Sequence, residues 1–109
     1  MKLELKENMY YRTYSGSINK ITSIKDYNER EYLLNGFYIN KDTIKKVSYN
    51  IIDILKVGDY VNGCKVIKNT LKDGGNIVIV QGGNCFTNEE IKLVITHEQM
   101  EQMTYKVGE

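Results

Sequence analysis

The chain of 109 residues is 41% hydrophobic and 27% charged, which predicts one folded domain, residues 1–109, with a modest core. Fifteen Lys and Arg against fourteen Asp and Glu leave a net charge of +1, so no overall field attracts nucleic acid or an anionic membrane. No apolar run reaches the ~20 residues of a membrane-spanning helix, and the N-terminus lacks the apolar segment of a signal peptide. We therefore expect a cytoplasmic protein without membrane association, whose two cysteines stay reduced and act as small core hydrophobes.

The first half of the chain has the pattern of short strands. Alternating polarity or β-branched and aromatic composition predicts five of them, at 2–6, 9–14, 18–24, 31–34 and 37–40. The small residues 15–17 turn the second strand into the third, which gives a first hairpin. Asn35-Gly36 tolerates the positive φ angles of a type I′ turn and predicts a second hairpin from the last two strands.

Residues 50–67 contain a helix start, a helix stop and a tight turn. Asn50 is placed to cap a short helix with its side-chain oxygen, and Asp53 follows three positions later, where an acid can reach back. Gly58 ends this helix. An Asn-Gly pair then joins residues 59–61 to residues 64–67, which predicts a third hairpin.

The second half continues with short elements. Turns are predicted at 72–76 and 81–84, strands at 77–80, 92–95 and 104–107, and a helix over 97–103. Thr96 and Gln99 have the spacing of a capping box for this helix. About eight short strands with two or three short helices predict a mainly β fold, a small SH3-like antiparallel barrel or sandwich.

No group of residues in the sequence completes a catalytic or metal site. His97 is the only histidine, and Cys64 and Cys85 lack the spacing of zinc ligands. The carboxylates flank turns and helix starts, where caps and solvent explain them, and the glycine pairs lack the pattern of phosphate-binding loops. We therefore predict no catalytic residue, no metal, no cofactor and no enzymatic activity.

Nine tyrosines are the main compositional anomaly, and four candidate binding residues lie close together near the N-terminus. On a strand Tyr10, Arg12 and Tyr14 share one face while Tyr11 takes the other, so one of the two sets should be exposed. Tyr and Arg are enriched at binding hot spots and also stack on bases. The alternative is a core that contains many tyrosines.

A second candidate patch precedes the short helix. It consists of Lys45, Lys46 and Tyr49, which combine positive charge with an aromatic ring. A solvated loop explains these three residues equally well, so the pattern does not choose between the two interpretations.

Three segments, "YRT" at 11–13, "NIIDILKVGDYVNGCKV" at 50–66 and "VITHEQMEQMTYKV" at 94–107, carry a family resemblance. With them the chain resembles a family of small uncharacterised proteins encoded by phages and prophages of low-GC Gram-positive bacteria. It departs from the family pattern at Cys64, where an aromatic residue is usual, and at Met100, where Phe is usual. Phage accessory proteins of this size commonly block host defences by stoichiometric binding, so the resemblance implies such a role without naming a target.

The leading functional hypothesis is a non-enzymatic phage or prophage protein in the host cytoplasm. It would bind and neutralise a host defence protein, for example as an anti-CRISPR-type inhibitor. One alternative is a sponge for a nucleotide-derived second messenger, built as a homo-oligomer around a closed pocket. Another is an SH3-like nucleic-acid-binding module, which the near-neutral charge disfavours.

Overall fold

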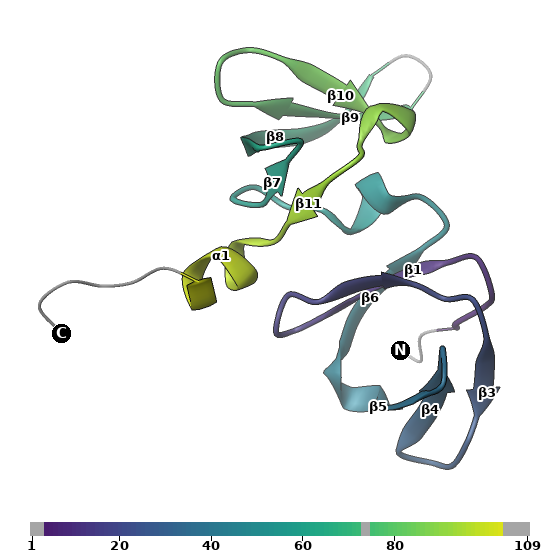
Figure 1. Ribbon diagram of the computed structural model, residues 1–109. Helices are drawn as coiled ribbons and strands as arrows, with labels where there is room; N and C mark the ends of the chain where they lie inside the picture. Colours follow the sequence, from purple (N-terminus) through teal and green to yellow (C-terminus); the bar gives the residue numbers. More distant parts are fainter. Residues whose placement is uncertain (1–3, 73–74, 104–109) are drawn as a thin grey trace, which may run out of the picture. The chain divides into compact units, whose positions relative to one another are not determined.

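The computed structural model describes residues 4–72 and 75–103, which divide into two compact units, 1–54 and 55–109 (Figure 1). The fold is mainly β with short helices, as the sequence predicts. The described strands form three antiparallel sheets rather than one closed barrel. The single domain over 1–109 stays a prediction. No helix within the described ranges combines the length and apolar character that crossing a membrane requires.

The first unit contains two three-stranded sheets, ordered β2-β1-β6 and β3-β4-β5. Its strands are β1 (Tyr10–Thr13), β2 (Ile18–Lys20), β3 (Ile24–Asp26), β4 (Glu31–Leu34), β5 (Phe37–Asn40) and β6 (Ile44–Ser48). Two 3-10 helices accompany them, η1 (Lys41–Thr43) and η2 (Ile51–Ile54). The core of this unit is formed by Leu5, Tyr11, Ile21, Tyr32, Leu34 and Ile44.

Both predicted hairpins of this unit are confirmed. β1 pairs with β2 and β4 pairs with β5, and the Asn35-Gly36 turn has positive φ at both residues. The predicted strand at 2–6 is wrong for residues 4–6, which lie outside any strand although Leu5 reaches the core. Residues 2 and 3 lie outside the described ranges.

Strands β2 and β3 behave as two halves of one bent strand. Ile21 donates its N–H to the Met9 carbonyl at 2.7 Å, which continues the pairing with β1. Ser23 accepts from the Asn35 N–H at 3.0 Å, which begins the pairing with β4. The chain therefore passes from one sheet into the other, and the strand order becomes β6-β1-β2/β3-β4-β5.

The second unit has one five-stranded sheet, ordered β10-β9-β8-β7-β11. Its elements are β7 (Tyr60–Val61), β8 (Cys64–Lys72), β9 (Gly75–Val80), β10 (Cys85–Thr87), η3 (Asn88–Glu90), β11 (Val94–Ile95) and α1 (His97–Met103). The third predicted hairpin, at Asn62-Gly63, and the capping box are confirmed: Thr96 N donates to Gln99 Oε1 at 3.0 Å, and Gln99 N donates to Thr96 Oγ1 at 3.2 Å. The predicted strand at 104–107 and part of the turn at 72–76 lie outside the described ranges.

The two units share one architecture. In each, the strand that follows a 3-10 helix pairs back with the unit's first strand: β6 with β1, and β11 with β7. The 3-10 helices η1 and η3 end at buried isoleucines, Ile44 and Ile91, which begin the similar segments "IKKV" and "IKLV". Each unit therefore places its last strand beside its first, so the chain repeats one strand order.

Ser48 connects the two sides of the start of η2: its Oγ accepts the Asn50 N–H at 3.1 Å and donates to Asp53 Oδ2 at 2.7 Å. The cap expected from the Asn50 side chain stays a prediction. The prediction for the cysteines needs correction. Cys85 is exposed on β10 and Cys64 is half-buried, so Cys85 is not a core residue.

Candidate functional site

Of the N-terminal candidates, Tyr11 and Arg12 lie in the interior. Tyr11 is 4% exposed within the core, and Arg12, 1% exposed, donates Nη1–H to the Ile54 carbonyl at 3.0 Å. The prediction that one face of β1 is open is wrong, because η2 contacts both β1 and β6. Only Tyr10, half-buried, and Tyr14, exposed, remain as surface residues of this group.

The second predicted patch lies mainly on β6 rather than in a loop. The Tyr14 N–H donates to the Thr43 carbonyl at 2.9 Å, which holds Tyr14 beside the start of that strand. Lys45 Nζ consequently lies 6.0 Å from the centroid of the Tyr14 ring. Lys46 and Tyr49 are exposed. The structure thus brings Tyr14 and Lys45 together from the two predicted patches.

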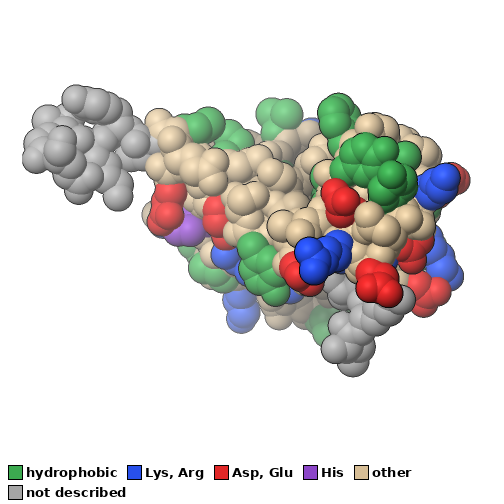
Figure 2. All heavy atoms as spheres, turned by 90° about the horizontal axis from the view of Figure 1, so that it is seen from below, with side chains coloured by type: hydrophobic (Ala, Val, Ile, Leu, Met, Phe, Trp, Pro, Cys, Tyr) green, Lys and Arg blue, Asp and Glu red, His purple; other side chains and the backbone are tan. Residues whose placement is uncertain are grey.

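A larger exposed aromatic group, which the sequence reasoning missed, lies on one face of the β3-β4-β5 sheet. Pairing across the sheet aligns Lys25, Leu33 and Tyr38 in one row, and Glu31 and Tyr27 continue the same face. We call Tyr27, Glu31, Leu33 and Tyr38 the outer face. Figure 2 views the molecule from the side of β3, β4 and β5 and shows hydrophobic side chains grouped beside acidic and basic ones.

The two tyrosines of the outer face contact each other. Their ring centroids are 4.8 Å apart with planes inclined by 67°, an edge-to-face arrangement. A hydrogen bond with Tyr27 raises the pKa of Tyr38 above its usual value, and the charges of Tyr27 and Glu31 act in the same direction. Even so, Tyr27 is 50% exposed and Tyr38 is 58% exposed, so both rings offer contact area to a partner.

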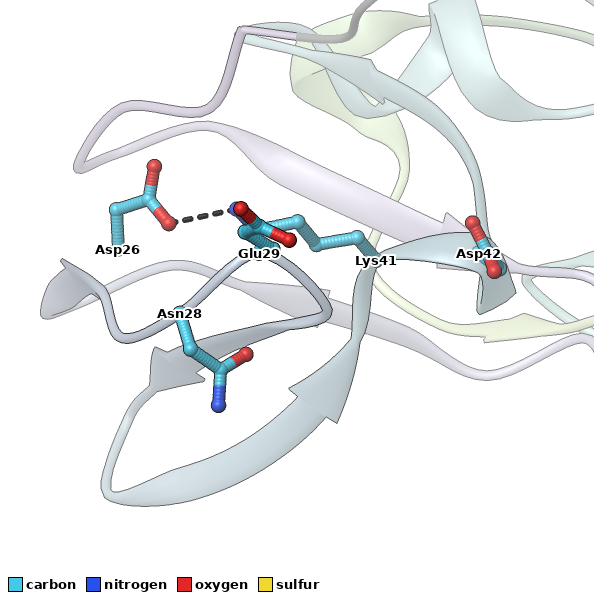
Figure 3. A pocket seen from close by; sticks show the side chains of 5 residues that line it. All are labelled: Asp26, Asn28, Glu29, Lys41 and Asp42. Carbon is cyan, nitrogen blue, oxygen red and sulfur yellow. Dashed lines mark hydrogen bonds and ion pairs between the residues drawn. The ribbon is translucent and has the colours of Figure 1, made fainter.

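The loop between β3 and β4 borders an open hollow of about 480 Å³ (Figure 3). Three carboxylates, one amide and one ammonium line it: Asp26, Glu29, Asp42, Asn28 and Lys41. Lys41 extends from η1 and pairs with Asp26 Oδ1 at 2.6 Å, and its ammonium also lies 4.6 Å from the centroid of the Tyr32 ring. The remaining carboxylates leave the hollow with an excess of negative charge, which opposes phosphate binding.

The second unit offers an internal comparison for the outer face. Its corresponding rows, aligned through the 3-10 helix caps Asn40 and Thr87, are Lys68–Ile79–Cys85 and Thr70–Ile77–Thr87. Lys25 therefore has a counterpart in Lys68, whereas Thr70, Ile77 and Cys85 stand where the first unit has Tyr27, Glu31 and Tyr38. The shared fold does not require an aromatic or acidic residue at these three positions.

The sequence contains a signal for the outer face. The Asn35-Gly36 turn fixes the register of its hairpin, so Leu33 must pair with Tyr38 and point to the same side. The period-two pattern then assigns Tyr32 and Leu34, both buried, to the opposite side. Applying this register to the tyrosine content would have identified Tyr38.

Within the described residues no cluster of His, Cys, Asp and Glu is suited to a metal ion. Comparisons of the chain with protein-family models, curated proteins and solved structures found no match.

Proposed function

We propose that this is a phage or prophage accessory protein that acts in the host cytoplasm by binding and neutralising a host defence protein, without catalysis. The outer face of the first unit forms the contact surface. The observation that carries this proposal is the exposed Tyr27–Tyr38 pair, which the equivalent sheet of the second unit does not have.

The physical basis is the cost and gain of burying these rings. A tyrosine has few rotatable bonds, so fixing it at an interface costs little entropy while it contributes a large contact area. Tyr27 and Tyr38 already restrict each other through their edge-to-face contact. On β4, Leu33 adds aliphatic contact surface, and Glu31 adds a charged group at the edge of the aromatic pair. This combination is typical of a protein-binding hot spot.

The structure gives less support to the two alternatives. A second-messenger sponge must hold phosphate groups, whereas the hollow at the β3–β4 loop carries three carboxylates and one ammonium. A nucleic-acid module needs a basic surface, but the outer face includes the acid Glu31, on the strand between those that carry the two tyrosines. We therefore propose neither of them as the function.

The test is affinity capture from a low-GC Gram-positive host that carries active defence systems, followed by measurement of Kd for the captured protein. The double variant Tyr27→Thr, Tyr38→Ser takes small residues like those of the second unit, so it should fold normally and bind about 100-fold more weakly. The matched control Tyr14→Ser, Tyr49→Ser removes two other exposed tyrosines and should bind like the wild type. The expected functional result is loss of host immunity with the wild type and the control only.

Two outcomes would contradict the proposal. Full binding by the Tyr27, Tyr38 variant would exclude the outer face as the interface, and loss of binding only in the Tyr14, Tyr49 control would move the interface to β6. Native mass spectrometry after exposure to a macromolecule-free lysate is the second check, because a retained mass of several hundred daltons would indicate a sponge.

A further inference from the structure

On the inner side of the β3-β4-β5 sheet, the Lys41 ammonium is bound by an aromatic ring and a carboxylate together. Lys41 Nζ lies over the Tyr32 ring, at 4.6 Å from its centroid, and forms an ion pair with Asp26 at 2.6 Å. Asp26 and Tyr32 are direct partners in the β3–β4 register. An aromatic face and a carboxylate on neighbouring strands thus bind one cationic side chain between them.

The outer side of the same sheet repeats this arrangement. Tyr27 is opposite Glu31 across β3 and β4, and Tyr38 follows on β5. The Glu31 charge acts on Tyr38, and the Glu31 carboxylate accepts from Asn28 Nδ2 at 3.4 Å. In the described part of the chain, no Lys or Arg forms an ion pair with Glu31 or lies over either ring.

Charged residues of both signs lie near Tyr27, Glu31 and Tyr38. The hollow, whose Asp26 and Lys41 lie on the inner side of the sheet, also contains Glu29 and Asp42, which form no ion pair among the residues the structure describes. Lys25, in the row with Leu33 and Tyr38, is positive and has a positive counterpart in Lys68 of the second unit, so it does not distinguish the two units. The three residues that distinguish the first unit are Tyr27, Tyr38 and Glu31.

We infer that Tyr27, Tyr38 and Glu31 bind an arginine side chain presented by the partner protein. This inference rests on the proposed function and specifies the partner as one with an exposed arginine in a basic segment. A planar guanidinium can stack on a tyrosine ring while donating two hydrogen bonds to a carboxylate, which a lysine ammonium cannot do in the same geometry.

The test uses the full chain and defined probes rather than the host protein. Backbone amide NMR shifts are followed during titration with a Gly-Arg-Ser repeat peptide, the matched Gly-Lys-Ser and Gly-Glu-Ser peptides, and a short oligothymidylate. The expected result is saturable shifts at Tyr27, Glu31 and Tyr38 with the arginine peptide, and about tenfold weaker binding of the lysine peptide. Glu31→Gln and the double variant Tyr27→Thr, Tyr38→Ser should each weaken arginine binding about tenfold or more.

The matched control is Glu89→Gln, which removes one exposed carboxylate from η3 of the second unit and should leave binding unchanged. Equal weakening by Glu31→Gln and Glu89→Gln would show general charge attraction and overturn the inference, as would equal affinity for the lysine peptide. Saturable oligothymidylate binding at the outer face would replace it with nucleic-acid recognition. If no peptide binds but capture of a host protein still depends on Tyr27 and Tyr38, arginine recognition is rejected. The proposed function then remains supported.

Discussion

Arg12 Nη1 donates a 3.0 Å hydrogen bond to the carbonyl of Ile54, forty-two residues further along the chain and also buried. This contact ties β1 to the 3-10 helix η2 and satisfies a carbonyl at its end. The Arg12 guanidinium therefore stabilises the interior of the first unit and is not exposed to a partner.

Replacing Arg12 by Met should destabilise the protein by about 1–3 kcal/mol, because the Ile54 carbonyl loses a charged donor where water does not replace it. Lys at this position should rescue little, since its single ammonium lacks the planar reach of the guanidinium. Urea unfolding measures both effects, with Lys46→Met as a control on the adjacent exposed position. A neutral Arg12→Met change would show that the hydrogen bond contributes nothing to stability.

Two asparagines use the same side-chain clamp in the two units. Asn35 Oδ1 accepts the N–H groups of Thr22 and Ser23 at 2.7 and 3.2 Å, while its Nδ2 donates to Lys20 at 2.8 Å. Asn62 repeats the pattern: its Oδ1 accepts the backbone N–H groups of Lys92 and Leu93, and its Nδ2 donates to the backbone carbonyl of Glu90. Each clamp joins an Asn-Gly turn to a neighbouring segment.

Asn35→Gly and Asn62→Gly should therefore each destabilise the chain by about 1–2 kcal/mol, although glycine suits their positive φ angles of 53° and 51°. Asn→Asp at either position keeps the acceptor but loses the donor and should have an intermediate effect. Thermal unfolding of the four variants provides the measurement. If the glycine variants were as stable as the wild type, the turns would depend on backbone conformation alone.

The sequence was sufficient for features with a local cause. Asn35-Gly36 sets its own hairpin because both residues accept positive φ, and the Thr96–Gln99 cap is formed within one turn. These signals lie within a few residues of the structure that they specify, so the residue types alone predicted them.

The buried position of Arg12 and the outer face depend on contacts that no local pattern contains. Period-two alternation predicted that one side of β1 is open, but η2, which follows β6, contacts that strand. In the same way, the exposure of Tyr38 depends on which side of β4 faces the core. The repetition of one strand order in the two units could not be predicted from the sequence either, because only the segments "IKKV" and "IKLV" are clearly alike.

Asp59 is a buried carboxylate that connects the start of α1 to the turn before β7. It accepts the N–H of Lys56 at 2.7 Å and that of His97 at 3.0 Å. Asp59→Ala should destabilise the protein by about 2 kcal/mol or more, since both donors lose a charged acceptor. Hydrogen exchange should accelerate most at Lys56 and His97. Uniform protection in the variant would argue against this local role.

Glu90 gives a stability effect that depends on pH. Hydrogen bonds from the backbone and hydroxyl of Thr87, at 2.9 and 3.0 Å, lower the pKa of Glu90 below 4.5. A lowered folded-state pKa means that the stabilisation is present above the unfolded-state pKa and is lost as the pH falls through the folded-state value. The wild type should therefore exceed Glu90→Gln in stability at neutral pH, and the difference should shrink at acidic pH. Urea titrations across this range measure it, and a pH-independent difference would contradict the assignment.

The hydrogen bond between the outer-face tyrosines can be tested by titration. Because it raises the pKa of Tyr38 above 10.0, the ring should keep its proton at a pH where an ordinary tyrosine has lost it. Tyr27→Phe removes the hydroxyl and its charge, so the pKa of Tyr38 should fall toward 10.0 while the ring contact is kept. The measurement is the NMR shift of the Tyr38 ring carbon bonded to oxygen, with Tyr49→Phe as the control on another exposed tyrosine. An unchanged Tyr38 titration in Tyr27→Phe would show that the two hydroxyls do not interact in solution, and the outer face would then present two independent rings rather than one coupled pair.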